Sequence, residues 1–420
     1  MSSPLTIIET GALLDPASGL TVIGRAIAVR DGIVEAILEP SEARPDPGAA
    51  ETIDLRGLTA LPGLIDCHAH LIGDIQAAGV PAIGATAAAE LAAGEAHAWE
   101  TLVAGVTTVR DVGTYRGLLD LQLRDRINLG IVPGPRMQCA GAMITRPRGG
   151  GEVTGDPAFV IPPEFRMGVV RDVVEVQTVV DRLIEAGAEV IKLIVTGAVL
   201  TVGTEIDDIE LEAPLIRAAV ETASKHGVHV AAHAHGAQGI RIAAAAGVRS
   251  VEHASLLDDD GIRVMLERGT FLVADVYDGD WIDEVGRRDG WPAETLAKNT
   301  ATTEAQRSGF TRALRAGVRM AFGTDSGVYP HRFVGRQFPI MVRLGMTPLE
   351  VIQSTTTSAA DLMGWSDRIG SLTPGHLADL IAVSGDPTVE IEHLIDPAVV
   401  LKAGRIVVDR RPIQAAQSAS

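Results

Sequence analysis

The sequence predicts an α/β protein, a (β/α)8 TIM-like barrel with a small β-sandwich domain formed by the N- and C-terminal segments. Three observations support this fold class. Short apolar runs alternate with longer helical patterns between residues 59 and 365, as in successive βα units. Strand-rich segments flank that region on both sides. The chain has 420 residues, enough for one barrel of about 250 residues and one smaller domain.

The two ends of the chain share a pattern typical of antiparallel strands. Residues 1–58 contain the runs LTIIETGALLD and AIAVRDGIVEAILE, which are rich in Ile, Val and Thr and broken by Gly and Asp-Gly. The same pattern returns near the end in ADLIAVSGDP and VVLKAGRIVVDRRPI. We therefore expect residues 1–58 and 366–413 to pair into one composite β-sandwich domain, with residues 59–365 forming the barrel.

Eight short apolar runs are the candidate strands of the barrel. They cover residues 63–67, 106–111, 135–140, 189–195, 228–233, 249–253, 270–275 and 318–324. Helical patterns lie between them, for example over residues 171–186, 210–226, 238–246 and 295–316. The stretch from 143 to 167 is irregular and rich in Gly and Pro, and a connection of this length is often functional.

Composition and charge exclude several classes of protein. The net charge of −18 argues against a nucleic-acid partner, since phosphate binding needs clustered Lys and Arg. Two cysteines do not make a disulfide framework, and we find no signal peptide and no apolar stretch of the roughly 18 residues that a membrane span requires. We expect a cytoplasmic protein with a small-molecule substrate and no membrane partner, assembled as a homo-oligomer.

Candidate metal ligands stand at the ends of four predicted strands. The run PGLIDCHAHL places His68 and His70 two residues apart, on the same face of the first strand. His233 and His235 end the fifth strand in VHVAAHAHG, and VRSVEHASL places His253 at the end of the sixth. The eighth strand ends in MAFGTDSG with Asp325. Active sites of such barrels lie at the carboxyl ends of the strands, so this set predicts a centre for Zn²⁺ or a similar ion.

A lysine in the fourth strand has two interpretations. Lys192 lies within the nearly apolar run EVIKLIVTG, where a buried ammonium is costly unless it is paired. In the first interpretation the side chain extends to solvent at the end of the strand. In the second, CO₂ carboxylates the amine and the product is an anionic ligand between two metals. The strand pattern alone favours the first.

Together these residues resemble the signature of the amidohydrolase superfamily: His-x-His on the first strand, Lys on the fourth, His on the fifth and sixth, and Asp on the eighth. The resemblance covers essentially the whole chain. It implies two divalent metal ions, one held by His68, His70 and Asp325 and one by His233 and His253. It also implies that Lys192 is carboxylated and bridges them. Asp325 is then the catalytic residue, which takes a proton from metal-activated water and returns it to the leaving amine.

The stretch TDSGVYPH and its surroundings resemble the prolidase-like and carboxypeptidase-like branch, which includes ochratoxin amide hydrolases. That branch implies cleavage of an amide bond to a C-terminal amino acid with a free carboxylate, in a dipeptide, an N-acyl amino acid or an ochratoxin A-type substrate. A cation or histidine recognises such a carboxylate. Our candidates for this contact are His235, His331, Arg336 and Arg146, with Arg148 and Arg332 as further ones.

One departure from the family pattern leaves the substrate open. Where a Gly-Gly-His-Gly type loop is expected after the third strand, this chain reads ITRPRGGGEVTG. The missing histidine and the two added arginines change the expected substrate pocket. Hydrolysis of a cyclic amide or imidazolone is an alternative. Deamination of a nucleobase is a weaker one, because it uses a His-x-x-Glu arrangement after the fifth strand, whereas here Gln238 follows His235 by three residues.

Overall fold

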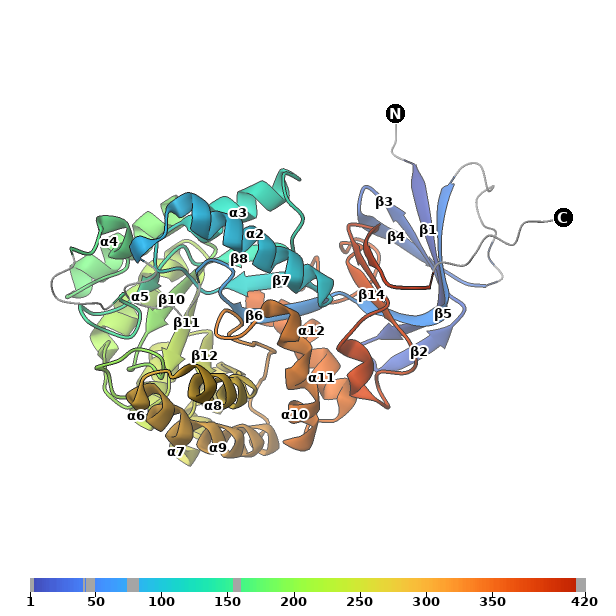
Figure 1. The fold of residues 1–420 in the computed structure, drawn as a ribbon. Helices are drawn as coiled ribbons and strands as arrows, with labels where there is room; N and C mark the ends of the chain where they lie inside the picture. The colour runs from blue at the N-terminus through green and yellow to red at the C-terminus, as the bar shows by residue number, and fades with distance from the viewer. Residues whose placement is uncertain (1–3, 41, 43–49, 74–82, 154–159, 413–420) are drawn as a thin grey trace.

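The computed structural model describes residues 4–40, 42, 50–73, 83–153 and 160–412. Figure 1 shows a barrel surrounded by helices and, beside it, a smaller unit of strands in which both ends of the chain meet. Within the described residues, no helix is both long and apolar enough to cross a bilayer.

The smaller unit is a single mixed sheet built from both ends of the chain. Its described strands are β1 (Leu5–Asp15), β2 (Leu20–Ile23), β3 (Ala26–Arg30), β4 (Ile33–Leu38), β5 (Ala50–Pro62), β14 (Leu380–Val383), β15 (Val399–Lys402) and β16 (Arg405–Asp409). Their order is β16-β15-β14-β5-β1-β3-β4, with β2 paired to β1. The antiparallel pairing of β5 with β14 joins the two ends of the chain, as the strand-rich termini predict. The boundary residues expected for the two domains stay a prediction.

The described barrel strands form two parallel sheets. One contains β6 (Leu64–Ala69), β7 (Val106–Asp111) and β8 (Arg136–Cys139). The other contains β9 (Met143–Ile144), β10 (Val190–Ile194), β11 (His229–Ala234), β12 (Ser250–His253) and β13 (Phe271–Val273). Seven of the eight predicted strands are confirmed to within a few residues.

The predicted eighth strand, residues 318–324, is not a regular strand, but it lies between the two sheets. The Ala321 amide donates to the Leu272 carbonyl of β13, and the Cys67 amide of β6 donates to the Phe322 carbonyl. A Cβ added to Gly323 would lie 2.3 Å from Val273 and 2.8 Å from His68, so the segment packs tightly against both neighbours. This packing brings the residues that follow it to the carboxyl end of β6.

Helices surround the barrel strands in Figure 1. They are α2 (Ala87–Val103), α3 (Leu119–Asn128), α4 (Val173–Glu185), α5 (Ala213–Lys225), α6 (Ala237–Ala246), α7 (Asp259–Arg268), α8 (Asp278–Asp289) and α9 (Ala293–Ala316). Three shorter helices follow, α10 (Gln337–Arg343), α11 (Pro348–Ser354) and α12 (Thr357–Met363). Short 3-10 turns occur at η2 (Pro163–Phe165), η3 (His331–Arg336) and η4 (Ile391–Leu394).

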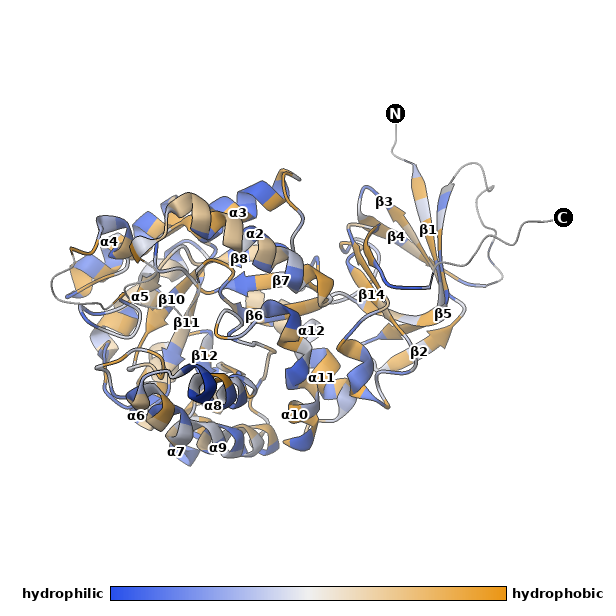
Figure 2. Cartoon of the chain, in the orientation of Figure 1, coloured by the Kyte–Doolittle hydropathy of each residue, from blue (hydrophilic) through white to orange (hydrophobic). Residues whose placement is uncertain are grey.

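Helix α4 illustrates why these segments become helices. Its buried residues Val176, Val179, Val180 and Leu183 recur at the spacing of one helical face, and the Asp172 side chain caps the first turn by accepting from the Glu175 amide. Figure 2 shows the resulting pattern: the helices carry hydrophilic and hydrophobic residues side by side, whereas β10 and β11 are largely hydrophobic. The hydrophobic core therefore lies between the strands and the helices, and polar side chains lie at the carboxyl ends of the strands.

Candidate metal centre

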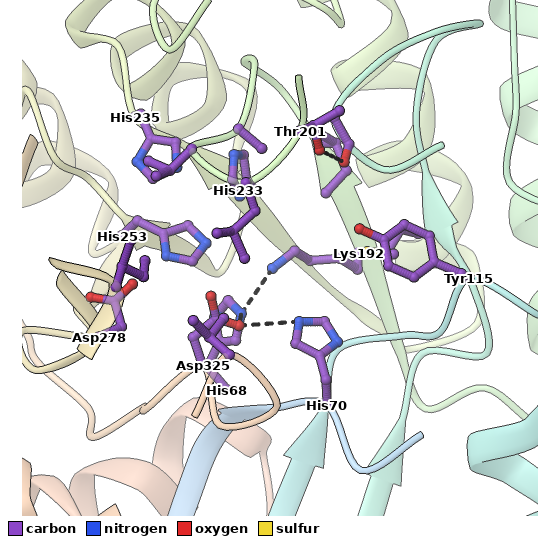
Figure 3. Close-up of a pocket in the computed structure, with 18 residues that line it drawn as sticks. His68, His70, Tyr115, Lys192, Thr201, His233, His235, His253, Asp278 and Asp325 are labelled. Carbon is purple, nitrogen blue, oxygen red and sulfur yellow. Dashed lines mark hydrogen bonds and ion pairs between the residues drawn. The ribbon is translucent and has the colours of Figure 1, made fainter. Parts of the chain in front are cut away.

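The six predicted ligands line one cavity at the carboxyl ends of the barrel strands. His68 lies in β6, Lys192 in β10, His233 in β11 and His253 at the end of β12. His70 follows β6, and Asp325 follows the 318–324 segment, whose packing against β6 brings it to His68. All six border the same open cavity (Figure 3).

His68, His70 and Asp325 bring polar side-chain atoms together at one point of the cavity. His70 Nδ1 lies 2.8 Å from the Gly113 carbonyl, which can only accept, so this nitrogen carries the ring proton. His68 Nδ1 lies 2.8 Å from the Glu252 carboxylate, which fixes the same tautomer. Both Nε2 atoms lie 3.3 Å from Asp325 Oδ1. Two imidazole nitrogens and a carboxylate oxygen that converge in this way are a typical ligand set for a bound cation.

Electrostatics keep Asp325 in the form that binds a cation. Burial by itself raises the pKa of this carboxyl, but His68 and His70 lower the pKa well below its usual value, so Asp325 is ionised. Its φ of 55° lies in the left-handed region, which a non-glycine residue adopts at an energetic cost. Donor atoms of His68, His253 and Asp325 all lie within 4.8 Å of one another. The donor set of imidazoles and a carboxylate fits Zn²⁺.

Lys192 is buried inside the site and does not extend to solvent. Its side chain is 1% exposed, and Nζ lies 3.4 Å from His68 Nε2 (Figure 3). Burial lowers the pKa of Lys192 to about 8, against the opposing effect of Glu252 and Asp325. The interpretation in which this ammonium reaches water is therefore wrong, and a fraction of the side chain is a neutral, nucleophilic amine near neutral pH.

The second group of histidines adjoins the first, since the His68 and His253 ring centroids are 4.8 Å apart. In Figure 3, His233 lies between Lys192 and the pair formed by His235 and His253. The His233 and His253 ring centroids are 4.6 Å apart, and His235 stacks on His253 at 4.9 Å. His235 Nδ1 is engaged by the Ser255 hydroxyl at 2.7 Å. His233 Nε2 lies 3.3 Å from the Gly197 carbonyl, and both histidines line the cavity.

Buried charged residues support the ligands from behind, and sequence reasoning missed them. Arg110, 1% exposed, donates to both oxygens of Glu252 at 2.9 and 3.0 Å, and Glu252 in turn fixes His68. Asp275 accepts from His253 Nδ1 at 2.9 Å. Asp275 could have been predicted from the sequence, because it is the last residue of the predicted seventh strand. Arg110 lies within a run predicted as a buried strand, where an unpaired charge is costly.

The remaining wall of the cavity is mostly apolar, and its polar groups include Tyr115, Thr201 and Asp278. The apolar lining residues are Met143, Ile194, Ala198, Val199, Leu200, Ile282 and Val328. Figure 3 shows the Tyr115 hydroxyl pointing toward the cavity. Burial and the negative charge of Asp325 raise the pKa of Tyr115 to about 12, so its hydroxyl remains a donor. Nothing in the sequence pattern had indicated these three polar residues.

Of the four predicted carboxylate contacts, His235 lines the cavity and the other three do not. His331 is 1% exposed, stacks on His97 at 4.8 Å and lies 3.1 Å from the Thr101 hydroxyl through Nδ1. Arg336 donates to the Tyr277 hydroxyl at 2.9 Å and lies over the Phe333 ring. Arg146 lies near Glu210: burial raises the pKa of that carboxyl, and the charge of Arg146 opposes the shift.

Arg332 and Arg148 are also absent from the described lining. Arg332 pairs with Glu100 at 3.1 Å on the surface. Part of the loop that carries Arg146 and Arg148, residues 154–159, lies outside the described residues. Leaving the predicted metal ligands aside, the described lining therefore contains no arginine or lysine that could pair with a substrate carboxylate. Its remaining hydrogen-bond donors are uncharged if His235 is unprotonated. Burial and the neighbouring His253 lower the pKa of His235 to about 3, so that ring is neutral near pH 7.

The chain is similar in sequence and structure to known hydrolases. A model of the amidohydrolase family matches residues 59–407. Ochratoxinase from Aspergillus niger is 29% identical over 417 residues, covering 94% of this chain and 84% of that protein. Imidazolonepropionase from Chromobacterium violaceum is 27% identical over 407 residues, covering 88% of each. The crystal structure of a Xaa-Pro dipeptidase with bound methionine has a TM-score of 0.88 and 34% identity, covering 96% of this chain and 99% of the other.

Proposed function

The chain belongs to the amidohydrolase family, and from that premise we propose that it cleaves an amide or peptide bond to a C-terminal amino acid with a free carboxylate. The substrate is a dipeptide or an N-acyl amino acid, with an ochratoxin A-type amide as a special case. The observation that carries the proposal is the convergence of His68 Nε2, His70 Nε2 and Asp325 Oδ1. The relatives named ochratoxinase and Xaa-Pro dipeptidase support the substrate class.

Two divalent ions, zinc in our proposal, fit these donors. His68, His70 and Asp325 hold the first, and His233 and His253 hold the second. Bound metals of this kind supply an activated water and polarise the scissile carbonyl. The site is closed off from behind by Glu252 and Asp275, whose carboxylates orient the ligand rings.

A carboxylated Lys192 is the proposed bridge between the metals. The neutral amine attacks CO₂, a new N–C bond forms, and one proton is released, which leaves an anionic carbamate. Burial favours this step because it disfavours the ammonium, and the pKa of about 8 leaves neutral amine available. The carbamate also balances charge, because two dications in one cavity repel each other unless anionic ligands surround them.

The chain's own residues then position the substrate and move the proton. In this proposal Asp325 accepts a proton on its carboxylate and returns it to the leaving nitrogen. The apolar wall, which includes Met143, Ile194 and Leu200, accommodates the side chain or acyl group of the substrate. His235 and Tyr115 offer hydrogen-bond donors for the substrate carboxylate.

The test compares zinc-loaded protein acting on N-acetyl-L-phenylalanine and on its C-terminal amide, with acetate release as the readout. We expect the free acid to react with the higher kcat/KM, because the donors that pair with the carboxylate are left unsatisfied by the amide. The His235→Ala variant should raise KM for the acid more than for the amide. Equal turnover of acid and amide would remove the carboxylate from the proposal.

Cyclic amide or imidazolone hydrolysis is the second candidate, and the similarity to imidazolonepropionase favours it. The cavity also suits a ring, since neutral donors face an apolar wall. This candidate is tested with 4-imidazolone-5-propionate as the substrate. Ring opening is measured as the loss of its ultraviolet absorbance. Turnover of the imidazolone with none of the acyl amino acid would replace the first proposal by the second. Nucleobase deamination has less support, because Gln238 stands where that chemistry uses a glutamate.

A further inference from the structure

A buried lysine outside the metal centre binds the loop that forms one wall of the cavity. Lys298 lies on α9, and its side chain is 6% exposed. Its ammonium donates to the carbonyls of Ala198 at 3.0 Å, Thr201 at 2.7 Å and Thr204 at 2.8 Å. Glu294, one turn earlier on the same helix, lies 2.9 Å from it. The ammonium is therefore surrounded by oxygen atoms from a single loop and one carboxylate.

That loop has little other regular structure to hold its shape. It follows β10, the strand that carries Lys192, and residues 197–208 of it contain no described helix or strand. A pair of bridging residues, Thr196 and Ile209, closes its base. Buried backbone carbonyls need hydrogen-bond partners, and here the lysine provides them for three residues of the loop. Glu294 adds a fourth contact by accepting from the Gly203 amide at 2.8 Å.

The residues held in this way face the substrate cavity. Ala198, Val199, Leu200 and Thr201 all line it. The Thr201 hydroxyl also donates to the Gly150 carbonyl at 2.9 Å, which connects this loop to the glycine-rich loop on the next wall. The ammonium thus lies behind the wall, and apolar side chains lie in front of it.

We propose that Lys298 is a positioning residue that determines specificity by holding Val199 and Leu200 as an apolar wall against the substrate's side chain. This inference rests on the proposed hydrolysis of an acyl amino acid at the adjacent site. Lys298 touches neither the metal ligands nor the substrate, so its loss changes where the wall stands and leaves the reacting groups in place. The consequence is a change in binding of apolar substrates.

Lys298→Met tests the proposal, because methionine keeps the apolar stem and removes the ammonium. For N-acetyl-L-phenylalanine we expect KM to rise about tenfold, since three loop carbonyls lose the ammonium that joins them and the wall shifts, while kcat changes less than about threefold. N-acetylglycine, which has no side chain to contact the wall, should show little change. Lys225→Met, at an exposed position near the end of α5, is the matched control.

A kinetic effect of this kind differs from simple destabilisation. Partial unfolding lowers the active fraction and therefore kcat, but it leaves KM unchanged for both substrates. Hydrogen exchange of the amides of residues 198–204 gives a readout that does not depend on activity. We expect faster exchange in Lys298→Met at these amides and unchanged exchange at β10 and β11.

If Lys298→Met does not fold, the milder Glu294→Ala variant is the test in its place. It removes the contact with the Gly203 amide and the ionic partner of the ammonium, and should produce a smaller change of the same kind. Unchanged loop exchange in the folded variants, or equal changes in KM for both substrates, would overturn the proposal. Wild-type protein that hydrolyses neither substrate would instead refute the proposed function, and the exchange experiment would still decide the role of Lys298 in holding the loop.

Discussion

Glu252 offers a direct test of how the barrel interior supports the metal ligands. This carboxylate is fully buried, accepts from His68 and is paired with Arg110 and the Ser250 hydroxyl. Burial alone would raise its pKa, but Arg110 and His68 lower the pKa below its usual value, so Glu252 is ionised wherever the protein is folded. The Glu252→Gln substitution keeps the shape of the side chain and removes the charge.

Two consequences of Glu252→Gln can be sized from these contacts. Arg110 is left as a buried cation without its carboxylate, and breaking a buried pair costs about 3–5 kcal/mol in the free energy of unfolding. The glutamine NH₂ also faces Arg110, His68 and the Ser250 hydroxyl, which donate to the Glu252 carboxylate in the wild-type protein. His68 loses its anionic partner, and losses of this kind weaken metal binding by about 10–100-fold.

Urea unfolding of metal-free protein measures the first effect, and competition with a chromophoric chelator measures the second. Glu221→Gln, at an exposed position on α5, is the matched control and should change neither quantity. The reasoning is refuted if Glu252→Gln lowers the free energy of unfolding by less than about 1 kcal/mol and binds metal as tightly as wild type.

Three further predictions concern the metals, Lys192 and Glu210. Purified protein should contain close to two divalent ions per chain by elemental analysis and lose activity on chelation; fully active protein with one ion or none would contradict the binuclear site. Lys192→Ala should bind metal weakly and lose at least about 100-fold in activity, measured beside its metal content, because the anionic bridge is gone. Burial raises the pKa of Glu210 to about 7, so the folded protein holds a proton that the unfolded chain releases near pH 4.5. Its contribution to stability therefore falls as pH rises from about 4.5 to 7, and Glu210→Gln should remove this loss, on the order of 3 kcal/mol in urea titrations at pH 5 and pH 8. Parallel pH profiles for the two proteins would show that the carboxyl titrates normally.

Part of this site could be predicted from the sequence because the relevant rule is local. A parallel barrel brings the carboxyl ends of its strands to one rim, so residues that end apolar runs meet there regardless of their separation along the chain. His68, His70, His233, His253 and Asp325 follow this rule. Strand positions were found for the same reason, except for residues 318–324, where irregular pairing with β6 and β13 replaces a regular ladder.

Other features were decided only by tertiary packing. Whether Lys192 reached solvent depended on the residues around it, and the structure buries it beside His68. His331 and Arg336 follow Asp325 closely in sequence, yet their side chains pack against His97 and Phe333 away from the cavity. Beyond the end of a regular strand the periodicity that orients side chains is lost, and contacts between distant segments determine where each one points. The sequence by itself therefore determined which residues meet at the rim, and the packing of the loops determined what surrounds them.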